Sequence, residues 1–383
     1  MDFSFTGEQQ MLQDSVRSFA ERELKPDAHK RAHSKDYPYD AAHLLARHGL
    51  LGITIPEAKG GHGGSLFDAV LAIEQVALAC PRSADVIQAG NFGAVRVLAE
   101  FASEAQLERH LAGILAGDTI MSVCMTEPDA GSAATDLTTT ATPDGDGFRL
   151  NGSKIFTTHG MHAHLFLVYC RFGPGIDGIG SVLVERDTDG MRFGKGSEFM
   201  SGEEWTTFFF DDVYVPRENV LLGPGGFKKQ ISAFNVERLG NTSRALALGE
   251  YAFRVARDYA RDRKQFGRPL CEFQGLQWKF ADMRMKLDAA RLLLYRAAAN
   301  ADSGLPSASE TAIAKAYCNQ AGFEAAHEAI QVMGGMGYSQ ESLVEYCFRR
   351  TRGWMIAGGS IEMMKNRIAE EVFERRFSQR PGK

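Results

Sequence analysis

The chain has 383 residues, 44% of them hydrophobic, and a formal net charge of −5; this is enough for two or three domains with hydrophobic cores and too acidic for a general nucleic-acid surface. Its polar start does not resemble a secretory signal, and no uncharged apolar run is long enough to predict a membrane span. Six cysteines without C-x-x-C spacing predict neither a zinc knuckle nor a disulfide framework and favour a reducing compartment, so we expect a cytoplasmic protein.

The first part of the chain has the spacing of helices. Apolar residues recur at helical intervals from Gly7 to about Phe101, and breaks fall at Pro26, at Pro38 and in the loop "PEAKGGHGGS". This pattern predicts an N-terminal α-helical domain over residues 1–118.

The pattern changes at about Thr119. Short β-branched or aromatic runs such as "HLFLVYCRF" and "TTFFFDDVYVP" are separated by Gly, Asp and Pro, which is typical of strands in an antiparallel sandwich or barrel. We therefore predict a middle antiparallel β domain over residues 119–224.

Helical spacing returns after "LLGPGGF". Leu246, Gly249 and Phe253 follow at intervals of three and four, as do Phe280, Met283 and Leu287. Residues 225–383 are predicted to form a bundle of long antiparallel helices. The fold class expected is therefore α+β, in the order helices, sheet, helices.

Five motifs carry the functional signal: "TEPDAGS", "NGSKIFTT", "RKQFGRPLCEFQ", "QVMGGMGY" and "IAGGSIEM". Each alone has an ordinary explanation, since "GGMG" can end a helix and "NGSK" can form a hairpin. Together, in this order and over nearly the full length, they make the chain resemble the acyl-CoA dehydrogenase family. The resemblance implies an N-terminal helical domain, a middle β domain, a C-terminal four-helix bundle, bound FAD and a homotetramer built as a dimer of dimers.

The reaction that the resemblance implies is α,β-dehydrogenation of an acyl-CoA thioester in fatty-acid or organic-acid catabolism, with electrons passed to an electron-transfer flavoprotein. A base takes the α-proton while a β-hydride passes to flavin N5. Hydrogen bonds to the thioester oxygen must stabilise the developing enolate, and the base is a carboxylate. His162 and His164 could share a strand face, but no third ligand is evident and no metal is expected.

The stretch "WMIAGGSIEM" lacks the acid that many family members carry in the corresponding "YEGT", because Gly358 stands at that position. A minority branch, isovaleryl-CoA dehydrogenase among them, carries the catalytic glutamate on a bundle helix, and the matching position here is Glu237. The resemblance thus makes Glu237 the base and leaves the Gly358 N–H to donate to the thioester oxygen. The alternative is that Glu237 caps a helix start or pairs with Arg238 on the surface.

The flavin contacts are also assigned by resemblance. Thr126, Phe156 and Thr158 match positions beside the isoalloxazine, and Phe156 stands where the family often has Trp. The remaining assigned positions match contacts to FAD, several of them from a neighbouring subunit: Arg263, Phe266, Gln274, Gln331, Gly335, Ser360 and Glu362.

Four residues are assigned to the substrate. Ser132, Asn235 and Arg238 match CoA contacts, and a helix-surface ion pair is the alternative for Arg238. Arg82 stands in "CPRSADVIQAG", which is similar to the acyl-pocket segment of glutaryl-CoA dehydrogenase, where an Arg binds the distal carboxylate. A guanidinium suits a distal carboxylate or sulfinate, but a solvated Arg after Pro81 is the competing interpretation. The expected substrate is thus an acyl-CoA, with a short chain bearing a distal anion as one option.

Other functions remain open at this point. The same scaffold could be an acyl-CoA oxidase, reductase or desulfinase, although Glu237 argues against a desulfinase. It could also be a non-catalytic homologue that binds FAD and CoA, which Gly358 suggests and Glu237 opposes. A nucleic-acid-binding relative would need a basic face, and the net charge is negative.

Overall fold

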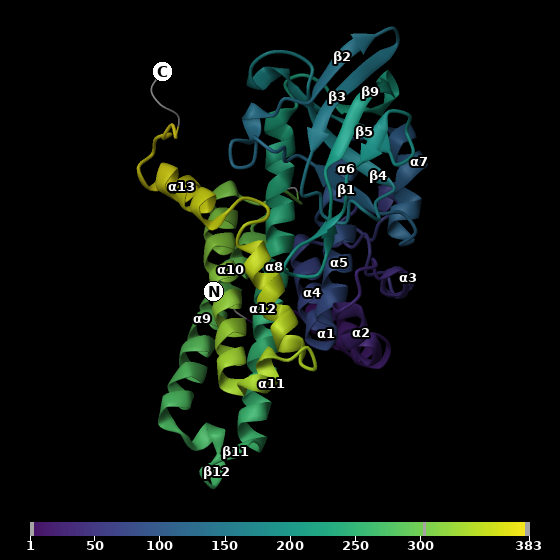
Figure 1. Ribbon diagram of the computed structural model, residues 1–383. Helices are drawn as coiled ribbons and strands as arrows, with labels where there is room; N and C mark the ends of the chain where they lie inside the picture. The colour runs from purple at the N-terminus through teal and green to yellow at the C-terminus, as the bar shows by residue number, and fades with distance from the viewer. Residues whose placement is uncertain (1–3, 302–303, 380–383) are drawn as a thin grey trace. The chain divides into compact units, whose positions relative to one another are not determined.

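The computed structural model describes residues 4–301 and 304–379. The chain divides into two compact units, each made of separate segments; Figure 1 labels the elements and colours them by residue number. The helical unit comprises Met1–Ala32, Leu66–Asp85 and Arg238–Lys383, and the sheet unit comprises His33–Ser65 and Val86–Glu237. These units cut across the three segments expected from sequence, whose boundaries at 118 and 224 stay predictions.

The helical unit is built from long amphipathic helices. Thr6 and Gln9 form a capping box that starts the first of them. Further along, a Cβ on Gly249 would lie 2.6 Å from the Cα of Gly322, so two of the long helices approach backbone to backbone there. The helices are α1 (Gly7–Phe19), α2 (Ala28–Ala32), α4 (Leu66–Ala79), α8 (Phe227–Asp262, whose first part up to Glu237 belongs to the sheet unit), α9 (Gln274–Ala299), α10 (Ala308–Met333), α11 (Gly335–Tyr338), α12 (Leu343–Trp354) and α13 (Ile361–Val372).

The sheet unit contains a mixed sheet and shorter helices. Its strands run in the order β10-β5-β4-β2-β3-β9-β6, with β1 beside β4. Its helices are α3 (Tyr39–Arg47), α5 (Ala84–Asn91, shared with the helical unit), α6 (Ala94–Phe101) and α7 (Glu104–Leu115). The sheet strands are β1 (Met121–Cys124), β2 (Thr140–Asp144), β3 (Gly147–Lys154), β4 (Leu165–Arg171), β5 (Ile179–Glu185), β6 (Met191–Phe193), β9 (Phe208–Pro216) and β10 (Val220–Leu222).

Most strand pairs are antiparallel, as expected, but β1 and β2 each pair with β4 in parallel. The chain that separates β1 from β4 includes the whole β2–β3 hairpin, and a connection of this length lets a strand return in the same direction. Two short hairpins complete the strands: β7 (Ser197–Glu198) with β8 (Glu204–Trp205), and β11 (Lys264–Gln265) with β12 (Arg268–Pro269).

The inner face of the sheet forms the core of the sheet unit. Side chains of β4 and β5, such as Leu167, Tyr169 and Leu183, pack with residues of α6 and α7, such as Leu98 and Leu111. Alternating or continuous burial along these strands explains their β-branched and aromatic composition. In the part of the chain that the structure describes, no helix has the length and apolar character needed to cross a bilayer.

Candidate active site

Glu237 lies well inside α8 and is half-buried. The side-chain amide of Gln88, in α5, donates to its Oε2 at 2.5 Å. A Cβ on Gly93, just before α6, would lie 3.2 Å from the same oxygen, so the glycine leaves space for the carboxylate. Because α8 begins at Phe227, Glu237 does not cap a helix start. The niche offers a half-buried carboxylate with a neutral hydrogen-bond donor beside it, an arrangement in which a carboxylate can accept a proton.

The glycine pair before α13 has a special backbone. Gly358 and Gly359 have φ of 73° and 92°, in the left-handed region that favours glycine. Arg238 donates from Nε to the carbonyl of Gly358 at 3.1 Å. The Ser360 side chain accepts from the Met363 N–H and caps α13. The helical unit thus brings Arg238 and Gly358 together and turns the Gly358 carbonyl, rather than its N–H, toward the guanidinium.

A buried lysine also holds the loop that contains Gly358 and Gly359. Lys315, in α10, is fully buried and donates to the carbonyls of Trp354 and Ala357 at 3.1 and 2.8 Å. Asn241 in α8 accepts from the same ammonium at 3.2 Å, and Asn319 donates to the carbonyl of Trp354 at 2.8 Å. These bonds from α10, together with the bond from Arg238 in α8, hold the backbone around Gly358 rigidly.

Two of the motifs expected beside the flavin are joined in the sheet unit. The N–H of Ile155 donates to the carbonyl of Thr126 at 2.9 Å, and Ser122 donates to the carbonyl of Thr158 at 2.8 Å. Phe156 has a positive φ of 59° and is 48% exposed, and Thr158 is exposed. An exposed aromatic ring and an exposed hydroxyl, both on a constrained backbone, suit a planar polar cofactor.

A buried ion pair holds these two motifs. Lys154, at the end of β3, is fully buried and donates to Glu127 at 2.8 Å and to the carbonyl of Met125 at 3.1 Å. The Glu127 carboxylate also accepts from the N–H and hydroxyl of Thr138 and from the N–H of Thr139. Burial alone would raise the pKa of Glu127, but Lys154 and these hydrogen bonds outweigh it and lower the pKa to about 2.

The hairpin at the far end of α8 carries three more of the expected residues. Arg263 and Gln274 are exposed, and Phe266 is 93% exposed at a positive φ of 50°. A large aromatic ring that is almost fully exposed on a strained backbone is costly unless a ligand or another chain covers it.

Gln331 and Gly335 lie where α10 ends and α11 begins. Both are exposed, and a Cβ on Gly334 or Gly335 would meet nothing within 4 Å. Lys279 in α9 pairs with Glu328 in α10 at 2.5 Å, which places the start of α9 beside the end of α10, as Figure 1 also shows. Open glycine backbone fits the diphosphate and adenine end of FAD.

The other assigned residues have varied surroundings. Ser132 is exposed between β1 and β2, whereas Asn235 is buried in α8. Glu362 is exposed in the first turn of α13, where hydrogen bonds from its own N–H and from Ser360 lower its pKa. Arg238 is half-buried and bonds the Gly358 carbonyl.

Arg82 is buried, at 3% exposure, and is therefore not a solvated surface residue. Its Nη1 lies 3.4 Å from Asp85, whose carboxylate is bound more closely by Arg244 at 2.8 Å and Arg350 at 2.7 Å. The guanidiniums of Arg244 and Arg350 also lie over the ring of Trp354. Three guanidiniums share one carboxylate, so these four side chains have an excess of positive charge.

Sequence reasoning missed several of these partners. Gln88 is in the same segment as Arg82, but a glutamine in a helix gives no signal of its own. Arg244, Arg350 and Asp85 are far apart in sequence and meet only through the fold. Among residues 4–301 and 304–379, no group of three His, Cys, Asp or Glu side chains could hold a metal ion.

Family models match the chain along most of its length. Residues 6–118 match the N-terminal domain of acyl-CoA dehydrogenase, 122–213 the middle domain and 224–373 the C-terminal domain. Among relatives, 3-sulfinopropanoyl-CoA desulfinase of Paraburkholderia xenovorans is 35% identical and covers 99% of both chains. The short-chain-specific acyl-CoA dehydrogenase of Clostridium acetobutylicum is 32% identical over 97% of this chain and 100% of its own.

Comparison with solved structures gives the same result as the family models. The glutaryl-CoA complex of glutaryl-CoA dehydrogenase has a TM-score of 0.93 at 30% identity and covers 100% of this chain and 99% of its own. Butyryl-CoA dehydrogenase of Megasphaera elsdenii has a TM-score of 0.90 at 33% identity, over 97% and 100%. A chain solved in work on the electron transferring flavoprotein of Acidaminococcus fermentans has a TM-score of 0.91 at 32% identity, over 97% and 99%.

The helical, sheet and helical segments expected from sequence are confirmed by this agreement, and the residues assigned to the flavin suit that cofactor. The chain belongs to the acyl-CoA dehydrogenase family, FAD-dependent enzymes that act on CH–CH groups.

Proposed function

We propose that the protein dehydrogenates a short acyl-CoA thioester between Cα and Cβ, with Glu237 as the base that takes the α-proton. The observation that carries this proposal is the niche of Glu237. Its half-buried carboxylate sits against the amide of Gln88, and the missing Cβ of Gly93 keeps it uncrowded. A substrate that covers it would exclude water, raise its proton affinity and prepare it as a base.

Gly358 supplies the second part of the proposal. It has no side chain, but its N–H can donate to the thioester oxygen as negative charge develops there. Arg238 and Lys315 hold the surrounding loop through its carbonyls, so this N–H is preorganised. Bound FAD would supply a hydride acceptor for the β-carbon, and Thr126, Phe156 and Thr158 are the residues that would hold its ring system.

The acyl group is proposed to end in an anion. Arg82, Arg244 and Arg350 all contact the carboxylate of Asp85, and all four side chains are buried. Three guanidiniums gathered at one place favour the binding of an anionic group beside them. Arg82 is the member assigned to the acyl pocket by resemblance, and a guanidinium binds both oxygens of a carboxylate or sulfinate.

A second candidate is a desulfinase, favoured by the relatives with that activity and by the same arginines, which suit a sulfinate. Desulfination of a 3-sulfinopropanoyl-CoA consumes water, replaces the C–S bond by C–H and releases sulfite, so flavin gains no net electrons. Glu237 is the feature that favours dehydrogenation instead, because the α-proton of a saturated acyl group must be abstracted by a base.

One experiment separates the candidates. The FAD-bound protein is mixed without oxygen with butyryl-CoA, glutaryl-CoA and 3-sulfinopropanoyl-CoA, while flavin absorbance and sulfite are followed. Bleaching with glutaryl-CoA ahead of butyryl-CoA supports an anion-specific dehydrogenase. Sulfite release without bleaching supports a desulfinase, and bleaching by butyryl-CoA alone removes the anionic acyl group from the proposal.

The partners are proposed on similar grounds. An electron-transfer flavoprotein is the proposed acceptor, in line with the structural neighbour solved in work on such a protein. The homotetramer is supported by α9, on which Trp278, Met285 and Leu292 are each more than half exposed at a spacing of seven residues. Such an apolar stripe on one helix face is typical of a helix–helix interface between subunits.

A further inference from the structure

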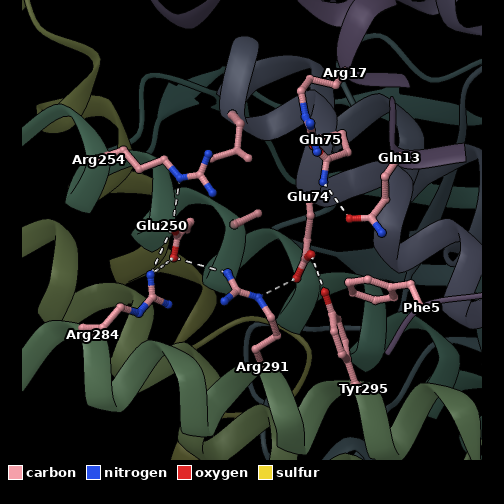
Figure 2. Close-up of a pocket in the computed structure, with 12 residues that line it drawn as sticks. Phe5, Gln13, Arg17, Glu74, Gln75, Glu250, Arg254, Arg284, Arg291 and Tyr295 are labelled. Carbon is pink, nitrogen blue, oxygen red and sulfur yellow. Dashed lines mark hydrogen bonds and ion pairs between the residues drawn. The ribbon is translucent and has the colours of Figure 1, made fainter. Parts of the chain in front are cut away.

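The helical unit contains a polar cavity of about 280 Å³ among α1, α4, α8 and α9 (Figure 2). None of the residues assigned above to flavin, CoA or catalysis lines it. Its walls are Phe5, Gln13, Arg17, Glu74, Gln75, Leu78, Ala247, Glu250, Arg254, Arg284, Arg291 and Tyr295.

One end of the cavity is organised by Glu250, which is buried. Its carboxylate binds Arg254 at 2.9 Å, Arg284 at 3.1 Å and Arg291 at 3.2 Å. Burial alone would raise the pKa of Glu250, but the three arginines outweigh it and lower the pKa. Glu250 is therefore an anion whose charge is already exceeded by the arginines around it.

The other end is organised by Glu74, which is also buried. Tyr295 donates to one of its oxygens at 2.7 Å, and the Nε of Arg291 lies 3.5 Å from the other. Figure 2 shows Arg291 between the two carboxylates. Burial raises the pKa of Glu74 despite the opposing effects of Arg291 and Tyr295.

Buried donors remain unused at both ends. Gln75 donates to the side-chain oxygen of Gln13 at 3.3 Å, so the Nε2 of Gln13 takes no part in this bond. Within the described part of the chain, neither this Nε2 nor the Nε of Arg284 finds an acceptor, although both atoms are buried. In Figure 2 these two side chains lie on opposite sides of the cavity. Unmet buried donors are costly, and a polar cavity of this size holds water or a solute.

The charge and the shape of the cavity limit the kind of solute that it can bind. Four arginines and two glutamates line the cavity, which leaves two positive charges in excess. Asp14 and Asp288 pair with lining arginines at the rim, but their side chains are more than half exposed and thus screened by solvent. Phe5, Leu78 and Ala247 supply an apolar wall.

We propose that this cavity binds one short aliphatic dicarboxylate, with one carboxylate at Gln13 and Arg17 and the other at Arg284 and Arg254. A dianion matches the excess of two positive charges, and its two ends match the two separated sets of donors. Its methylene groups would lie against Phe5 and Leu78.

The test is calorimetry and thermal unfolding of the FAD-bound protein with succinate, glutarate and butyrate, each compared with sodium chloride at the same ionic strength. The expected result is one diacid per chain and a rise in Tm of about 2 °C at roughly ten times the Kd. Butyrate, with one carboxylate, should bind at least about tenfold more weakly.

Variants locate the site. Gln13→Leu and Arg284→Lys each remove one unused donor and should weaken diacid binding about tenfold or more. Arg296→Lys is the matched control, because Arg296 lies on the same helix, pairs with Glu310 and does not line the cavity. Because Arg82 could also attract a diacid, binding must persist in Arg82→Ala and leave the flavin absorbance unchanged.

The proposal is overturned if no diacid binds at roughly 20 mM, if sodium chloride gives the same stabilisation, or if binding disappears in Arg82→Ala. It is also overturned if binding is unchanged in Arg284→Lys. That charge-conserving variant keeps the test decisive even if Gln13→Leu fails to fold.

Discussion

Glu127 and Glu237 are two carboxylates of the sheet unit with opposite surroundings. Glu127 is 4% exposed and receives an ammonium, a hydroxyl and two backbone N–H groups. Glu237 is half-buried and receives the neutral amide of Gln88. A carboxylate surrounded by charge-matched donors stays ionised and holds structure in place, whereas one held by a neutral amide is better able to gain a proton.

The comparison predicts that the two regions fail in different ways. Damage near Glu127 should unfold the sheet unit and release the flavin, because that carboxylate ties the "TEPDAGS" and "NGSKIFTT" motifs together. Damage near Glu237 should leave the fold and the flavin intact and change only the chemistry. Five changes, four at these two carboxylates or their partners and one at Arg82, are expected to have decreasing effects in the order given.

Lys154→Met should have the largest effect, on stability. It leaves Glu127 as a buried charge without its cation, which costs about 3–5 kcal/mol. The measurement is denaturant unfolding of the FAD-bound protein, together with the fraction of flavin retained. In the double variant Lys154→Met/Glu127→Gln the buried charge is gone, so its loss should be smaller than that of Lys154→Met. An equal or greater loss would contradict the charge argument.

Glu237→Gln should raise the reaction barrier by a similar free energy, while it leaves the stability of the fold unchanged. A neutral amide preserves shape but cannot accept the α-proton, and loss of a general base costs two to four orders of magnitude, about 3–5 kcal/mol of barrier. Rapid-mixing measurement of flavin reduction by the best acyl-CoA substrate checks this, with Tm as the control for folding. A rate within about tenfold of the unmodified protein would place the base elsewhere.

Acid should remove the contribution of Glu127 to the free energy of unfolding. Its pKa is lowered to about 2 in the folded protein from an ordinary 4.5, so the stabilisation is complete above about pH 4.5 and is lost as the pH falls toward 2. The expected loss is about 2–3 kcal/mol. It is measured as the stability difference between the unmodified protein and Glu127→Gln, which should shrink over this pH window. A difference that stays constant with pH would show that Glu127 is not specially stabilised as an anion.

Arg82→Ala tests whether an anion from outside completes the Asp85 cluster. A charge-assisted pair is worth about 1.5–3 kcal/mol, so glutaryl-CoA should bind one to two orders of magnitude more weakly. Butyryl-CoA should bind equally well or better, because a buried guanidinium is removed, and Arg82→Lys should restore only part of the loss. Equal losses for the two acyl-CoAs would make Arg82 structural.

The sequence predicted the fold and the residue types of the site better than it predicted their partners. Strand and helix segments followed from periodicity, and the motifs identified the family. The parallel pairings of β4 were missed, since local pattern carries strand identity but not strand direction. The ion pairs of Asp85 with Arg244 and Arg350 were missed, because residues so far apart in sequence give no local signal that they will meet.

Gln88→Leu is expected to have the smallest effect and tests the neutral side of the comparison directly. The Gln88 amide donates to the ionised form of Glu237, so its removal destabilises the carboxylate relative to the carboxylic acid and raises the proton affinity of Glu237. The acid limb of kcat/KM should therefore move to higher pH, and the maximum rate should fall roughly tenfold because the base is less well positioned. Gln88→Asn keeps an amide on a side chain that is one methylene shorter. Its pH profile and its maximum rate should therefore lie between those of the unmodified protein and of Gln88→Leu. A purely structural role for Gln88 would lower Tm and leave the pH profile where it was, and that outcome would separate Gln88 from the chemistry of Glu237.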